Sequence, residues 1–284
     1  SEDAHLTIHS LSNSSMITMS RANAGTPFAS SVYSAISESN YTFGSPDYFR
    51  NPTFSLEVSS PTSREVSVHI QLLSDDPRDL INVQLFHLED HALSKPLLCD
   101  SDYNYQKYEK LYIPLITNSK YKIICSSYTS PLSREFKLVV APSEPKIAEH
   151  LKLKLQKVYL EHGGYNHKIE KKFRWAENSN RIKIKLKLVA NTMCFIRLVP
   201  DAQFSKLLVR CNIFDHDTQQ NILQRKIFQR PTCGGIVLDK IELYGSTSVT
   251  LLIEKDDARS ANIPSKAISF SLILGSQTKI TIDE

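Results

Sequence analysis

The sequence predicts an all-β chain of two antiparallel β-sandwiches in tandem, preceded by a Ser/Asn-rich leader. Short runs in which apolar and polar residues alternate recur along the chain, which is the pattern of strands with one buried face. Gly, Pro, Asn and Asp residues form turns between these runs, and no segment has a convincing helical period. The 284 residues, of which 41% are hydrophobic and 23% charged, suffice for one large or two ordinary globular domains.

Residues 1–46 are rich in Ser, Thr, Asn and Ala and contain few apolar residues. We interpret them as a linker or loosely attached leader, with Leu6–Ile8 and Met16–Met19 as alternative edge strands. The first residues carry neither the basic nor the apolar region of a signal peptide. Because the chain begins at Ser1 without Met, we expect it to be part of a longer protein.

Residues 47–142 are expected to form the first sandwich. Three short apolar runs lie within Asn51–Leu88; the second alternates at Val66, Val68, Ile70 and Leu72, and the polar turn Ser74–Asp79 precedes the third. After a polar segment, further runs follow at Leu111–Ile113, Tyr121–Cys125 and Phe136–Val140.

Residues 146–284 are expected to form the second sandwich. The boundary falls at Ala141–Pro145, where two prolines disfavour both helix and central strand. Alternating or apolar runs then lie at 151–155, 182–188, 194–198, 207–214, 249–253, 268–274 and 279–282.

Charge is unevenly distributed between the two predicted domains. Up to Pro145 there are 11 Lys and Arg against 16 Asp and Glu, and after it 23 against 14. This asymmetry indicates different partners for the two domains, or attraction between them. If neighbouring strands carry the basic residues of the second half, alternation places their side chains on one solvent face. We predict that this face binds an acidic protein partner through Lys152, Lys154, Lys171, Lys172, Arg174, Lys183, Lys185 and Lys187. A merely solvated face that blocks edge pairing, an anionic lipid surface and nucleic acid are the alternatives.

Other candidate chemistry is weak in this sequence. The five cysteines are widely spaced and form no C-x-x-C pair, so free thiols are expected rather than a zinc site. Cys125, Cys194 and Cys211 fall within or beside strand runs, where a buried side chain is expected. Asp215-His216-Asp217 and the acids of Ser74–Asp79 are more typical of solvated turns than of metal ligands. We therefore expect no catalytic residue, metal or cofactor site in this chain.

The segments Asn51–Leu88 and Tyr121–Val140 resemble domain III of calpains, which is a β-sandwich. The closing strand of that domain has the form Phe-x-Leu-x-Val, and Phe136–Val140 matches it. Two such sandwiches without an EF-hand domain resemble the PalB-type calpain-like proteases of fungi. The acids of the loop that is acidic in animal calpains are sparse here, so calcium dependence is not expected.

The resemblance implies a cytoplasmic cysteine protease of the alkaline-pH response, whose catalytic core would precede Ser1. It implies cleavage of a zinc-finger transcription factor at endosomes, with ESCRT-III subunits and a scaffold as partners and only indirect membrane contact. The present chain would be a non-catalytic docking module that positions the core or its substrate. The alternative is a lipid- or trafficking-associated adaptor of β-sandwich domains with no protease parent.

Overall fold

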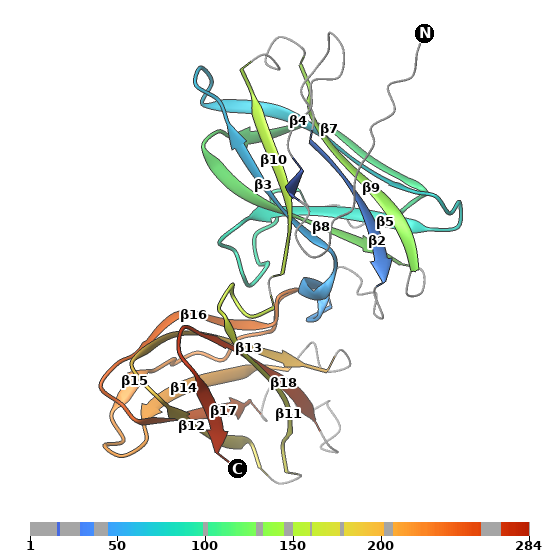
Figure 1. Ribbon diagram of the computed structural model, residues 1–284. Coiled ribbons are helices and arrows are strands. Elements are labelled where there is room, and N and C mark those ends of the chain that lie inside the picture. Colours follow the sequence, from blue (N-terminus) through green and yellow to red (C-terminus); the bar gives the residue numbers. More distant parts are fainter. Residues whose placement is uncertain are drawn as a thin grey trace, which may run out of the picture. The chain divides into compact units, whose positions relative to one another are not determined.

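The computed structural model describes residues 16–17, 29–36, 45–98, 102–128, 133–144, 150–159, 161–176, 179–201, 207–256 and 268–283. Strands dominate these residues, and their only helix is the short 3-10 turn η1 (Tyr48–Arg50). The all-β prediction is therefore confirmed. No helix in the described part of the chain is long and apolar enough to cross a membrane. The chain divides into two compact units, each built from two antiparallel sheets (Figure 1).

The first unit ends at Val158 and contains a six-stranded and a four-stranded sheet. The six-stranded sheet has the order β1 (Met16–Ile17), β10 (Lys152–Val158), β3 (Thr53–Ser59), β8 (Ser119–Ser127), β5 (Leu80–His87) and β6 (Asn104–Tyr105). The four-stranded sheet has the order β2 (Ala29–Ile36), β9 (Ser133–Pro142), β4 (Glu65–Ser74) and β7 (Lys107–Ile116).

Alternation in β4 produces the buried face that the sequence predicts. Val66, Val68, Ile70 and Leu72 are all at most 2% exposed and join one core with residues of the opposite sheet, among them Leu56. Burying each such aliphatic side chain stabilises the fold by about 1.5–3 kcal/mol.

Strand β5 differs from its predicted pattern, because both of its faces are buried. Asn82 and Gln84, expected to face solvent, are fully buried. The NH2 group of each amide has a hydrogen-bond acceptor: Gln84 Nε2 donates to Asn82 Oδ1 at 2.8 Å, and Asn82 Nδ2 donates to the carbonyl of Asp102 at 2.6 Å. The polar segment after β5 therefore supplies part of the cover that the strand pattern alone does not reveal.

Two strands depart from the expected domain organisation. Residues 29–36 of the expected leader form β2, which pairs with β9, while Met16–Ile17 form the edge strand β1. The expected strand at Leu6–Ile8 lies outside the described residues. Strand β10, assigned to the second domain from the sequence, instead pairs with β3 along seven residues of the first unit. Its buried residues Leu153 and Leu155 complete that unit's core.

The second unit contains Gly44–Phe49, His91–Ser94 and Tyr159–Glu284. Its four-stranded sheet has the order β11 (His167–Arg174), β18 (Ser269–Ser276), β13 (Thr192–Pro200) and β16 (Ile236–Leu243). Its five-stranded sheet has the order β15 (Asn221–Leu223), β14 (Val209–Asp215), β17 (Ser248–Lys255), β12 (Arg181–Leu188) and β19 (Ile280–Asp283).

Strand β13 carries a fully buried arginine, Arg197. Its guanidinium lies 3.9 Å from the ring centroid of Phe49 and 5.1 Å from that of Phe195, and it donates a hydrogen bond to the carbonyl of Gly234. Stacking on aromatic rings and a hydrogen bond compensate for the lost hydration of this cation. A charged residue thereby fixes a segment from much earlier in the chain within the second unit.

Adjacent leucines of β17 test the orientation of this strand. Leu251 is fully buried, whereas Leu252 lies on the opposite face and is partly exposed. Leu251→Ala should lower the free energy of unfolding by about 2–5 kcal/mol through the cavity it leaves, and Leu252→Ala should lower it much less. Urea unfolding of both variants measures the difference. Equal losses would contradict the observed register.

Candidate partner-binding site

The outer face of the five-stranded sheet of the second unit carries the candidate site. On β12, Ile184 and Leu186 are buried in the core, whereas the alternate residues Lys183, Lys185 and Lys187 point outward. This is the orientation that the sequence predicts for the three lysines.

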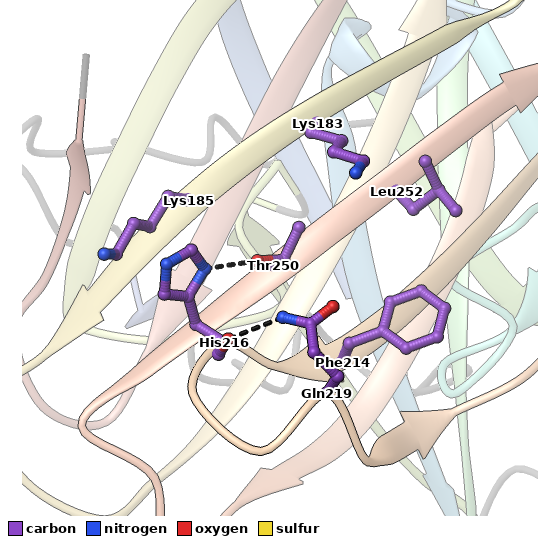
Figure 2. Close-up of a pocket in the computed structure, with 7 residues that line it drawn as sticks. All are labelled: Lys183, Lys185, Phe214, His216, Gln219, Thr250 and Leu252. Carbon is purple, nitrogen blue, oxygen red and sulfur yellow. Dashed lines mark hydrogen bonds between the residues drawn. The ribbon is translucent and has the colours of Figure 1, made fainter.

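Strand register determines what lies next to these lysines. Lys183 pairs with Leu252 of β17, Lys185 pairs with Thr250, and Thr250 in turn pairs with Phe214 of β14. The side chains of three strands therefore meet around a pocket of about 260 Å³. Figure 2 shows Lys183 and Lys185 on one side of β17 and Phe214 and Gln219 on the other. The pocket is lined by Lys183, Lys185, Phe214, His216, Gln219, Thr250 and Leu252.

The turn after β14 is held in place by the carboxylate of Asp215. Asp215 Oδ2 accepts a hydrogen bond from the hydroxyl of Ser246, at 2.5 Å. Oδ1 accepts the backbone N–H of Thr218 at 2.7 Å, the Thr218 hydroxyl at 2.8 Å and the N–H of Asp217 at 3.1 Å. These hydrogen bonds lower the pKa of Asp215 to about 2, and the bond from Ser246 has the largest effect. The Asp215 carboxylate therefore stabilises the turn through all of these hydrogen bonds.

The same turn presents His216 and Gln219 to the pocket. His216 Nδ1 and the Thr250 hydroxyl share a hydrogen bond of 2.8 Å, and Gln219 Nε2 donates to the carbonyl of His216 at 2.6 Å. Gln219 has a φ of +58°, a left-handed conformation that closes the turn. Figure 2 shows these two hydrogen bonds linking β17, the histidine and the glutamine along one wall.

The outward cations of β12 differ in whether they have acidic partners. Arg181 Nε lies 2.9 Å from Glu254 Oε1, and Lys187 Nζ lies 2.9 Å from Asp283 Oδ1. The hydrogen bond from Lys187 is the main reason why the pKa of Asp283 is lowered. Within the described part of the chain, neither Lys183 nor Lys185 has a carboxylate within ion-pair distance. Asp283 lies opposite Lys185 in the strand register, and the charge of Lys185 also lowers the pKa of Asp283, so the positive charge at the pocket is only partly compensated.

The expected single basic face is wrong, because its residues occupy three different sheets. Lys152 and Lys154 lie on β10 of the first unit, and Lys171, Lys172 and Arg174 lie on β11 in the other sheet of the second unit. Adjacency in sequence does not make these strands adjacent in a sheet. Lys172 also pairs with Asp201 at 3.2 Å. Of the predicted set, the structure brings Lys183, Lys185 and Lys187 together; partner binding by all eight residues stays a prediction.

The other pocket residues were not predicted as binding residues. Phe214, Gln219, Thr250 and Leu252 belong to segments that the sequence assigned only to strands or turns, and His216 was considered only as a metal ligand. The polar Thr250 at an outward position of an otherwise apolar run was the available signal.

Two acidic turns considered as metal sites serve structural roles. Asp76 Oδ1 accepts the backbone N–H of Arg78 at 2.8 Å, and the Ser74 hydroxyl donates to buried Asp79. Asp215 is occupied by its own turn, as described. In the described residues no group of three or more His, Cys, Asp or Glu is placed to hold a metal ion.

Three of the cysteines are buried strand residues, as expected. Burial raises the pKa of Cys194 and of Cys211 to about 12, and raises that of Cys125 still further. A thiol with so high a pKa forms almost no thiolate, the nucleophilic form, at neutral pH. Cys99 lies outside the described residues.

Two family models match the chain. The model described as the RIM13 third calpain-like domain matches residues 30–159, and the model described as RIM13 C-terminal matches residues 162–282. The two matches meet where the two structural units meet, at Val158 and Tyr159. Both halves of the chain are thus independently assigned to one kind of protein.

Curated relatives point in the same direction. Calpain-like protease 1 of Saccharomyces cerevisiae is 31% identical over 256 residues, which are 87% of this chain and 35% of that protein. Calpain-like protease palB/RIM13 of Kluyveromyces lactis is 31% identical over 122 residues, 43% of this chain and 17% of that protein. The protein of the same name from Candida glabrata is 22% identical over 291 residues, 99% of this chain and 40% of that protein. The chain spans about a third of the length of the first of these relatives.

The fold and the matches to the two family models together define a tandem of calpain-type β-sandwich domains. The chain belongs to the PalB/RIM13 family of fungal calpain-like proteases, of which it corresponds to the third calpain-like domain and the C-terminal region. The resemblance seen in the sequence is thereby confirmed.

Replacing Asp215 should loosen the turn that carries His216. Because the folded-state pKa of Asp215 is about 2 and the ordinary pKa of an aspartate is 3.8, the stability contributed by this carboxylate is complete above about pH 4. It is lost as the pH falls toward 2. Asp215→Asn should therefore unfold at lower urea concentration than the parent at neutral pH, and the difference should shrink in acid. A difference that stays constant over this range would contradict the role given to the carboxylate.

Thiol labelling tests the buried cysteines. In a variant with Cys99→Ser and Cys233→Ser, we expect no labelling by a disulfide reagent at neutral pH in the native state, and labelling of three thiols in urea. Rapid native labelling of one thiol would contradict the assignment and would favour a cysteine nucleophile within this chain.

Proposed function

We propose that this chain is a non-catalytic docking and positioning module of a calpain-like cysteine protease. Its match to the third calpain-like domain and C-terminal region of such proteases carries the proposal. The high pKa values of Cys194 and Cys211 support a non-catalytic role. Membership in a protease family favours this function over an adaptor without a protease parent.

We extend the proposal to the pathway that the family resemblance implies. The parent protease would process a zinc-finger transcription factor in the alkaline-pH response, in the cytoplasm and at endosomes. Its partners would be the protease core of the same chain, an ESCRT-III subunit and a pathway scaffold. An acidic protein surface suits the outer face of the five-stranded sheet, where Lys183 and Lys185 have no ion-pair partner among the described residues.

The proposal predicts different effects on large and small substrates of the full-length parent. The triple variant Lys183→Glu, Lys185→Glu, Lys187→Glu should lower cleavage of the transcription factor by about tenfold, equivalent to about 1.4 kcal/mol. Cleavage of a short fluorogenic peptide should not change, because such a peptide needs no docking surface.

The matched control is Lys120→Glu with Lys137→Glu, on exposed positions of β8 and β9 in the first unit and outside the predicted binding set. It should cleave both substrates like the parent. An equal loss with both substrates in the triple variant would indicate damage to the catalytic part. No loss with either substrate would exclude docking through this sheet face.

A further inference from the structure

We propose that the pocket across β17 binds an acidic peptide segment in which a Glu or Asp side chain is followed by an apolar side chain. The inference rests on the proposed docking function and specifies the chemistry of the occupant. Three properties of the pocket lead to it: its charge, the side-chain carbonyl oxygen of Gln219 on one wall, and its apolar wall.

The charge of the pocket fits a single carboxylate. Lys183 and Lys185 lie two residues apart on β12, so their Cα atoms are about 7 Å apart and their side chains leave the same face. A carboxylate placed between two ammonium groups forms charge-assisted hydrogen bonds, which are stronger than neutral ones. The next cations along this face, Arg181 and Lys187, are already paired with Glu254 and Asp283.

A polar group on the opposite wall fits a peptide backbone. Gln219 uses its Nε2 to donate to the carbonyl of His216, which fixes the orientation of the amide. Figure 2 shows its carbonyl oxygen on the side away from His216. This oxygen is an acceptor for a backbone N–H, a donor that a bare anion or a phosphate headgroup lacks.

The apolar part of the pocket fits a side chain next to the carboxylate. Phe214 and Leu252 lie on adjacent strands, β14 and β17, and both are only partly buried. Covering them with a leucine or phenylalanine would remove apolar surface from water, which favours binding. A ligand with charge alone would leave this surface exposed.

The same charge distribution argues against a membrane surface. Attraction to anionic lipid increases with each unpaired lysine or arginine near the surface. Here Glu254 and Asp283 neutralise the flanking cations, which leaves a local site rather than an extended basic patch. A recessed, partly apolar pocket with two cations is better suited to one acidic residue.

The direct test uses three synthetic peptides and the backbone amide NMR signals of this chain. The first peptide is acetyl-Gly-Ser-Glu-Leu-Glu-Leu-Ser-Gly-amide; in the second each Glu is replaced by Gln, and in the third each Leu is replaced by Ser. The first should shift the signals of His216, Gln219 and Thr250. The second and third should each bind at least about threefold more weakly, because each lacks one of the two recognised groups.

Variants of the chain show where the peptide binds. Lys183→Gln with Lys185→Gln should weaken binding of the first peptide by about tenfold, whereas the matched pair Lys120→Gln with Lys137→Gln, exposed lysines of β8 and β9 outside the predicted binding set, should leave it unchanged. Shifts confined to other residues, equal affinity for all three peptides, or no shift with the first peptide would each overturn the inference. So would binding to phosphatidylserine vesicles that Lys183→Gln with Lys185→Gln abolishes and the peptide does not displace.

The two proposals fail in distinguishable ways. If the peptide does not bind but the triple glutamate variant still loses cleavage of the protein substrate, docking stands and the inferred ligand is wrong. If the peptide binds at the pocket but cleavage of the protein substrate never changes, the pocket stands and the proposed docking function is wrong.

Discussion

The register of β12 on β17 is the constraint on which the second unit and its candidate site depend. It pairs Lys183 with Leu252 and Lys185 with Thr250 while the intervening Ile184 points into the core. A slip by one residue would move the lysines into the core and the isoleucine into water. Because burying an unpaired charge costs far more than exposing an aliphatic side chain, the core holds the register. The binding face is thus a direct consequence of how the core packs.

Around this face, hydrogen bonds and ion pairs determine which groups remain available. The carboxylate of Asp215 is used by its turn, and Glu254 and Asp283 are used by neighbouring cations. Two lysines of the face remain without an acidic partner among the described residues. Selectivity of the pocket therefore depends less on how many basic residues the sheet carries than on which of them are already neutralised.

Each unit buries polar side chains within a largely apolar sandwich. In the first unit, Gln84 donates to Asn82, and Asn82 donates to the backbone carbonyl of Asp102. In the second, Arg197 stacks on Phe49 and Phe195. Asn82 bonds to Asp102, and Arg197 bonds to Gly234 and stacks on Phe49, so these polar side chains connect segments that are distant in the sequence. Their burial favours one arrangement of those segments, because any other would leave a polar group without a partner.

The sequence by itself determined the all-β class, the inward face of β4, the outward direction of Lys183, Lys185 and Lys187, and the family resemblance. The alternation of apolar and polar residues is sufficient to predict the strands and their faces, because it shows which side of each strand is buried. It does not state which strand lies alongside, since every strand offers the same backbone donors and acceptors. Only the tertiary structure decided that β10 joins the first unit and that β11 and β12 lie in different sheets. For the same reason the pocket, whose lining comes from β12, β17, β14 and the turn after β14, could not be found from the sequence: its residues meet only because strands distant in the sequence pair in one sheet.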